Sequence, residues 1–180
     1  MKRLMSLLCV MGLIAAVTLS HSALAEDPPA EAGVPFHGSL GGETTSQAVF
    51  PPEPGPPTGF YVLGRGTGYA THLERFTVNW MFNVTIEASG NSSATGHSHF
   101  LAANGDSLFT VSTAEATPPD ENGIMTVVQT HSITPEAGTG RFAGASGSFT
   151  LTLRSQGQPN NGPFQYNFGT FEGTIILASN

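Results

Sequence analysis

The sequence predicts an all-β domain whose eight strands close into an antiparallel up-and-down barrel. From residue 34 onward, short runs rich in Thr, Ser, Gly and Phe alternate with turn signals, and no window carries an apolar stripe at helical spacing. The run Phe36-His37-Gly38-Ser39-Leu40 near the start also echoes Phe171-Glu172-Gly173-Thr174-Ile175 near the end. Neighbouring first and last strands would close the sheet and remove its exposed edges. A β-sandwich is the alternative architecture.

The first 25 residues have the pattern of a secretory signal peptide. A basic start at Lys2 and Arg3 precedes an apolar run over residues 7–19, and Ala23 and Ala25 form a small-x-small cleavage site. The apolar run is shorter than the ~20 residues that a membrane span needs, so stable membrane insertion is not expected. We therefore expect export to the periplasm or the extracellular space.

Removal of residues 1–25 would leave a chain with no lysine and no cysteine. Its four arginines stand against 13 acidic residues, and this negative balance argues against a nucleic-acid partner. The missing residue types exclude amine catalysis by lysine, thiol nucleophiles, disulfides and cysteine-ligated metals. The acidic residues 26–33 predict a disordered leader, and a single folded domain is expected over residues 34–178.

The expected strands follow one another at residues 36–40, 60–66, 70–84, 93–102, 107–114, 125–133, 148–153 and 168–177. The proline cluster at residues 51–57 predicts an extended loop, because proline cannot donate a hydrogen bond to a sheet. Ala103-Asn104-Gly105-Asp106 predicts a tight hairpin turn, since an Asn-Gly pair readily adopts positive φ. Within the glycine-rich residues 138–149 we expect tight turns, with Arg141 bonding loop carbonyls or a carboxylate and Phe142 plugging one end of the barrel.

The third expected strand carries the candidates for ligand binding and for chemistry. Side chains alternate between the two faces of a strand, so every second residue lies on the same face. The face expected to line the interior carries His72, Glu74, Phe76, Val78, Trp80 and Phe82. If the lumen is open, Phe76, Trp80 and Phe100 are the expected ligand-binding residues. His72 and Glu74 would lie at the barrel mouth, where they could exchange protons with a ligand. The alternative for this pair is structural, a partly solvated pair that closes the barrel end.

His97 and His99 form the second candidate site. Alternate positions on a strand share a face, so the two imidazoles have a spacing that metal sites use. No third ligand follows locally, although His37, His131 or Glu172 could converge from other strands. A one-residue change in the register of the hairpin would turn both histidines to the other face. Histidines that line the lumen or face outward are therefore the alternative, and no metal is predicted.

Three strings connect the sequence to a known family. They are Gly-Arg-Gly-Thr-Gly-Tyr-Ala-Thr-His-Leu-Glu-Arg-Phe-Thr at residues 64–77, Ala-Ala-Asn-Gly-Asp at 102–106 and Gly-Thr-Gly-Arg-Phe-Ala-Gly-Ala-Ser-Gly-Ser-Phe at 138–149. Together they resemble exported bacterial proteins with an allene oxide cyclase-like, dirigent-like barrel, over residues 34–177. The resemblance implies a calycin-like barrel whose lumen binds apolar or phenolic small molecules, often in homotrimers. The acidic catalytic or guiding residues of the characterised relatives are not found here, so the resemblance implies no activity.

Three functions are consistent with these observations. The first is a binding protein that holds a small apolar or phenolic ligand in the lumen. The second is an isomerase, cyclase or dirigent-type stereochemical guide that acts through His72 and Glu74, and the third is a structural envelope protein with a packed barrel. Phosphate-loop, dinucleotide, serine-hydrolase and zinc-protease motifs are all absent, so no cofactor is predicted.

Overall fold

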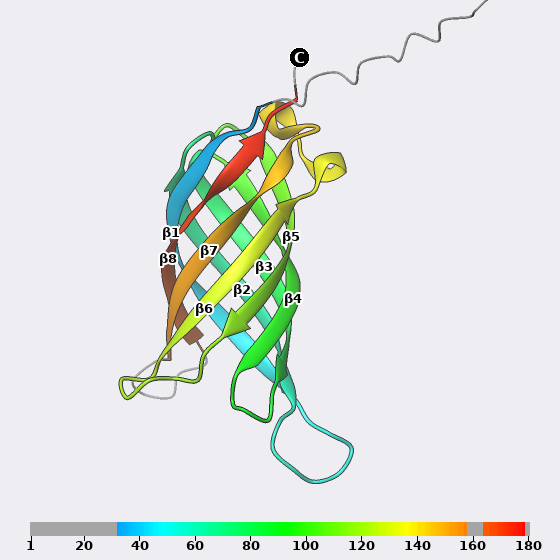
Figure 1. Ribbon diagram of the computed structural model, residues 1–180, viewed down its shortest axis with the longest axis vertical. Helices are drawn as coiled ribbons and strands as arrows, with labels where there is room; N and C mark the ends of the chain where they lie inside the picture. The colour runs from blue at the N-terminus through cyan, green and yellow to red at the C-terminus, as the bar shows by residue number, and fades with distance from the viewer. Residues whose placement is uncertain (1–31, 158–163, 179–180) are drawn as a thin grey trace, which may run out of the picture. The chain divides into compact units, whose positions relative to one another are not determined.

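The computed structural model describes residues 32–157 and 164–178, in which eight strands form one closed barrel (Figure 1). Each strand pairs antiparallel with its neighbours in chain order. The strands are β1 (Val34–Val49), β2 (Gly59–Ala70), β3 (Glu74–Ile86), β4 (Ser92–Ala102), β5 (Ser107–Ala116), β6 (Ile124–Ile133), β7 (Ser146–Gly157) and β8 (Phe164–Ile176). The predicted up-and-down barrel is confirmed, and the sandwich alternative is wrong.

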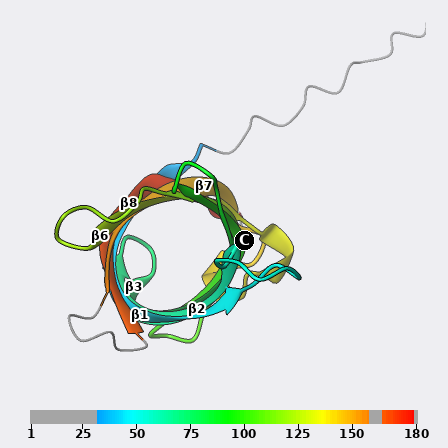
Figure 2. The same ribbon diagram turned by 90° about the horizontal axis from the view of Figure 1, so that it is seen from below.

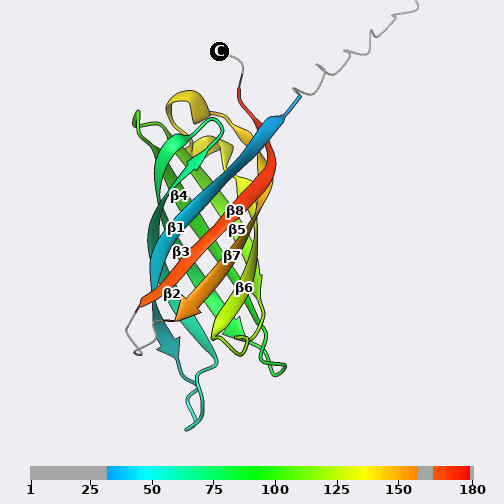
Figure 3. The ribbon, with the colours of Figure 1, turned by 90° about the vertical axis from the view of Figure 1, so that its left-hand side faces the viewer.

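The barrel is closed by the pairing of β1 with β8, which run side by side (Figure 3). Phe36 faces Gly173 and Gly38 faces Phe171 in this ladder. The two similar segments at the ends of the domain are therefore direct partners, as their likeness predicts. Closure leaves no free edge in the described part of the sheet.

Several observed strands, β2, β7 and β8 among them, differ in extent from the expected ones, and two further differences change the architecture. β1 continues to Val49, well past residue 40, and the expected strand at 70–84 is divided by a turn at residues 71–73. The turn is held by Thr71, whose hydroxyl accepts a hydrogen bond from the backbone N–H of His37 (3.0 Å). His72 and Glu74 take positive φ values of 64° and 55° there. The sequence gives no signal for this turn, because residues 71–73 contain neither glycine nor proline.

The two local turn predictions are confirmed. Gly105 has a φ of 91°, and the backbone N–H of Ala102 donates to the Asp106 carbonyl across the hairpin (2.9 Å). The Asn104 side chain accepts from the Asp106 N–H, at 3.1 Å, which fixes the corner. The proline-rich residues 51–57 form the loop between β1 and β2.

The predicted signal peptide at residues 1–25 and residues 26–31 of the predicted leader lie outside the described residues. Among the residues that are described, no helix has the length and apolar character needed to cross a membrane.

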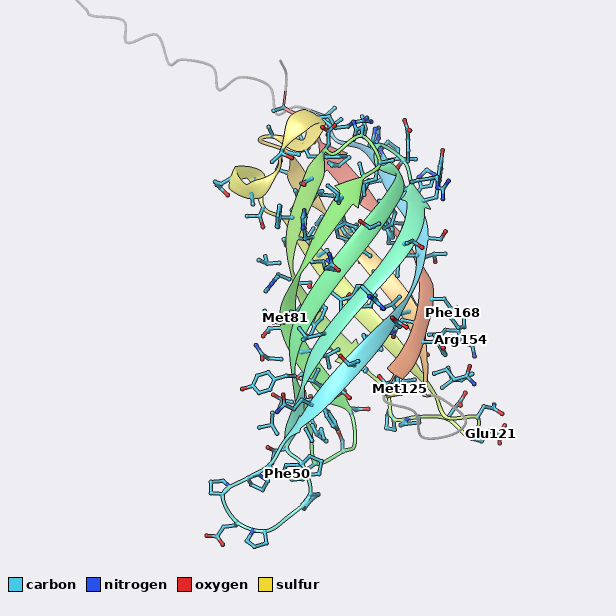
Figure 4. All side chains as sticks on the ribbon, turned by 180° about the vertical axis from the view of Figure 1, so that it is seen from behind. Phe50, Met81, Glu121, Met125, Arg154 and Phe168 are labelled. Carbon is cyan, nitrogen blue, oxygen red and sulfur yellow. The ribbon has the colours of Figure 1, made fainter. Side chains whose placement is uncertain are left out.

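Side chains alternate between the lumen and the outer surface along every strand. The predicted inward face of β3 is confirmed, since Phe76, Val78 and Phe82 are buried and Trp80 packs on the core. Met81 on β3 and Phe168 on β8 point outward (Figure 4). The outer face is mixed, with exposed apolar side chains such as Leu63, Met81 and Val111 lying among polar ones.

One half of the lumen is filled by aromatic side chains. Phe36, Phe149 and Phe171 pack with ring centroids 5.1–5.2 Å apart, and Phe100 joins them through Phe149 at 5.9 Å. All four are at most 3 % exposed. Contacts at these distances combine apolar burial with favourable ring geometry, so this half is the stabilising core of the barrel.

A glycine-rich loop seals this end of the barrel. It contains the two short 3-10 turns η1 (Pro135–Ala137) and η2 (Gly140–Phe142), and Phe142 is fully buried beneath them. Arg141 donates to the Asp106 carboxylate and to the His72 carbonyl, both at 3.0 Å. These contacts join three loops and confirm the roles expected for Arg141 and Phe142. Hydrogen bonds from Asn104 and Arg141 hold the pKa of Asp106 below its usual value.

We predict that Phe149→Ala lowers the free energy of unfolding by about 3–5 kcal/mol, because it removes a ring from the centre of the packed half. The outward neighbour Thr150→Ala serves as the control and should cost less than about 1 kcal/mol. Urea denaturation followed by circular dichroism measures both. Equal losses in the two variants would show that the lumen is not packed as described.

Candidate functional site

The other half of the lumen holds a cavity of about 350 Å³. It opens at the end carrying the β1–β2, β3–β4 and β5–β6 loops, and Figure 2 shows the strands surrounding the axis from this side. Its apolar lining consists of Phe60, Val62, Trp80, Phe82, Val84, Ile86, Met125, Val127 and Leu153, together with several alanines. A concave apolar site of this kind is the usual form of a small-molecule pocket.

Glycine residues in β1 and β2 keep this half of the lumen open. The indole of Trp80 lies against the backbone at Gly42, Gly64 and Gly66, and a Cβ atom at Gly64 would overlap the indole ring. Because these positions carry no side chain, the largest residue of the wall lies flat against the sheet. Space that a projecting indole would occupy is left for the cavity.

Polar side chains gather on the opposite wall. Trp80 is on β3, whereas β6, β7, β8 and the adjoining end of β1 contribute Gln129, Ser155, Gln165, Asn167, Thr44 and Ser46. All six are uncharged. Among the described residues that line the cavity only Glu115 ionises, and it is exposed. The lining from β2 and β3 is thus apolar, whereas the lining from β6, β7 and β8 mixes apolar side chains with neutral hydrogen-bonding ones, and this second part is called the polar wall.

A buried histidine lies beneath this polar wall. His131 is fully buried, stacks on Phe149 at 4.6 Å, and bonds Thr110 through Nδ1 (2.9 Å) and Gln129 through Nε2 (3.0 Å). Burial lowers the pKa of His131 to about 4, so the ring is neutral at physiological pH. The imidazole fixes Gln129, which lines the cavity, to the aromatic core.

The structure separates the three expected ligand-binding residues. Trp80 lines the cavity, whereas Phe76 and Phe100 lie in the packed half at 4 % and 1 % exposure. Phe76 and Phe100 contact each other at 5.5 Å between ring centroids. Their inward direction follows from strand periodicity, but their depth in the barrel depends on the stagger of the strands.

His72 and Glu74 lie at the sealed end and do not line the cavity. The carbonyl of His72 accepts the hydrogen bond from Arg141, and Glu74 is exposed at the start of β3. Their positive φ values take both residues out of the alternation that was used to place them on the inner face. Neither side chain is positioned to reach a molecule in the cavity.

His97 and His99 are on the outer surface of the barrel. Val111 is the partner of His97 in the β4–β5 register, and Phe109 is the partner of His99. His99 stacks on Phe109 at 4.1 Å and its Nε2 bonds the Ser107 hydroxyl at 3.1 Å, while burial lowers its pKa. Within residues 32–157 and 164–178, no three His, Cys, Asp or Glu side chains are grouped as metal ligands would be.

No protein-family profile, curated protein or solved structure matches this chain.

We predict that Gly64→Ala pushes the Trp80 indole into the cavity, because the added methyl group would overlap the ring. The expected cost is about 1–3 kcal/mol of stability, together with a shift in fluorescence of this single tryptophan. Gly41→Ala is the matched control, since a Cβ atom there meets only the Asn167 carbonyl at 3.8 Å. Identical tryptophan spectra in both variants would contradict the proposed packing of Trp80.

We predict that His131 makes the barrel less stable in mild acid. The unfolded histidine takes up a proton near pH 6.5 and the folded one only near pH 4, so stability is full above pH 6.5 and falls as the pH decreases toward 4. The slope is about 1.4 kcal/mol per pH unit, or roughly 3 kcal/mol in total.

His131→Phe should remove the part of the pH dependence of unfolding free energy that arises from this histidine. The part that arises from the carboxylates should remain. The exposed His97→Asn is the control and should behave like the parent. Urea midpoints measured from pH 4 to pH 7.5 test the prediction. A parent-like pH profile in His131→Phe would show that the histidine is not buried as a neutral ring.

Proposed function

We propose that this chain is a binding protein that holds one small apolar or phenolic molecule in the open half of its barrel. The observation that carries the proposal is the cavity itself, which lies in a lumen that is otherwise densely filled. Its volume of about 350 Å³ is at the small end of the range for ligand pockets, which suits a compact ring system. The resemblance to allene oxide cyclase-like barrels favours the same class of ligand.

Binding is better supported than catalysis by the composition of the wall. A general acid or base must lie within hydrogen-bonding reach of its substrate. Glu115 is the one ionisable residue among the described residues around the cavity, and it is exposed. His72 and Glu74, on which the isomerase hypothesis depends, are at the other end of the barrel.

A purely structural role is less well supported, because a packed barrel has no need of an open half. The glycines beside Trp80 forgo side-chain packing that larger residues would supply. Loss of packing lowers the stability of a protein core. Such unfilled space is common at sites that accommodate a ligand. Export and trimer formation remain predictions of the sequence and of the family resemblance.

The neutral dye N-phenyl-1-naphthylamine tests the proposal. We expect it to bind in the cavity and to quench Trp80 by energy transfer, since the indole forms part of the wall. Ala114→Phe should weaken this quenching, because Ala114 lines the cavity and a phenyl ring there would occupy part of the space that the dye needs. The control Thr113→Phe places the same ring on the outer surface and should leave quenching unchanged. Equal quenching in both variants would refute binding in the lumen.

A further inference from the structure

We infer that the cavity selects a neutral molecule that carries both a hydrogen-bond acceptor and a hydrogen-bond donor. The acceptor would be held by the amide nitrogen of Gln129 and the donor by the amide oxygen of Asn167. This inference rests on the proposed function and specifies its ligand. It follows from which polar atoms of the two buried side chains are already occupied.

At Gln129 the amide oxygen is occupied and the nitrogen is free. The oxygen only accepts, so the contact of 3.0 Å with His131 requires that His131 Nε2 donates. Nδ1 of the same neutral ring then accepts from the Thr110 hydroxyl at 2.9 Å. No described residue bonds the Gln129 amide nitrogen, whose two hydrogens can donate to a ligand.

At Asn167 the situation is reversed. Its amide nitrogen donates to the Thr44 hydroxyl at 3.0 Å and to the Gln165 carbonyl at 3.3 Å, which uses both hydrogens. In the described part of the chain nothing bonds its amide oxygen, which remains as an acceptor. The Thr44 hydroxyl in turn donates to the Gln165 carbonyl at 3.4 Å, so the Asn167 amide cannot rotate without losing these contacts.

Both free atoms are open to the cavity. Gln129 and Asn167 are 8 % and 6 % exposed, and both line the cavity. Among the described side chains, the Ser112 hydroxyl oxygen is the one buried polar atom that is both sealed from solvent and without a partner. The free amide atoms of Gln129 and Asn167 are therefore accessible, and the space they reach is the lumen. A buried polar atom of this kind gains free energy when a ligand satisfies it.

The two amides are close enough for one molecule to reach both. Gln129 is on β6 and Asn167 on β8, and Leu153 of β7 lines the wall between them. Gln129 pairs with Leu151 of β7 and Asn167 with Ser155, four residues further along the same strand. With about 4.8 Å between neighbouring strands and about 3.3 Å per residue along a strand, the two side chains leave the wall about 16 Å apart, a span that a ring system with a polar group at each end can bridge. A flat ring system lying between this wall and Trp80 could present a polar group to each amide.

The wall also disfavours anionic ligands. No lysine, arginine or histidine lines the cavity in the described part of the chain, so a carboxylate or phosphate would be buried without a counter-charge. Burying an unpaired charge is far more costly than burying a hydroxyl or carbonyl group that finds a partner. Neutral phenols, ketones and hydroxyketones fit these requirements, and fatty acids do not.

Four naphthalene probes test the inference by isothermal titration calorimetry near neutral pH. 6-Acetyl-2-naphthol offers an acceptor and a donor, its methyl ether lacks the donor, 6-ethyl-2-naphthol lacks the carbonyl acceptor, and 6-hydroxy-2-naphthoate is charged. We expect 6-acetyl-2-naphthol to bind about tenfold more tightly than the methyl ether and the ethyl probe, as one buried hydrogen bond would give. The naphthoate should bind more weakly than either of them, because its charge would be buried without a partner.

Two variants assign the contacts to residues. Gln129→Met should remove the preference for the acetyl probe over the ethyl probe and keep the preference for the naphthol over its methyl ether. Asn167→Leu should remove the preference for the naphthol over its methyl ether and keep the preference for the acetyl probe. Because each preference is a ratio within one variant, a general loss of stability does not imitate it. The control Gln156→Met changes an exposed glutamine of β7 and should keep both preferences.

Equal binding of all four probes, tightest binding of the naphthoate, or unchanged preferences in both variants would overturn the inference and leave the cavity as a binding site. Failure of every probe, together with failure of N-phenyl-1-naphthylamine to quench Trp80, would overturn the proposed function and this inference with it.

Discussion

The contact on which the open half of the barrel depends is the flat packing of Trp80 against the glycine backbone of β1 and β2. An eight-stranded barrel has a lumen that side chains can fill completely or that can hold one small ligand. Phenylalanine rings fill the sealed half of this lumen. In the open half the largest side chain is laid on the wall because Gly42, Gly64 and Gly66 leave room for it.

His131 and Gln129 form the boundary between the two halves. The histidine is stacked in the aromatic core and satisfied on both ring nitrogens, so a polar group is buried there without leaving an unpaired atom. Its partner Gln129 faces the cavity, and its orientation is therefore set by the core. A site whose polar groups are fixed before the ligand arrives loses less entropy on binding. The packed half thus stabilises the fold and also orients the polar wall.

Much of the fold could be predicted from the sequence, and much less of the site. The alternation of β3 from Phe76 onward and the Asn104-Gly105 turn depend on residues that are close in the sequence, and the likeness of the two end strands is visible when the segments are compared. These three predictions are confirmed. The depth of Phe100 and Trp80 in the lumen depends on the stagger between strands, which no local pattern contains. The roles of Gln129 and Asn167 were missed because they follow from hydrogen bonds to residues on the same or neighbouring strands.

Isotope-filtered NOE spectroscopy of the protein with N-phenyl-1-naphthylamine would test most directly whether a ligand occupies the open half of the lumen. We expect contacts from the probe to the methyl groups of Val84, Val127 and Leu153, which line the cavity, and none to Leu108 or Ile175 in the packed half. Contacts confined to the outward-facing methyl groups of Leu63 and Val111 would place the probe on the surface and contradict the account.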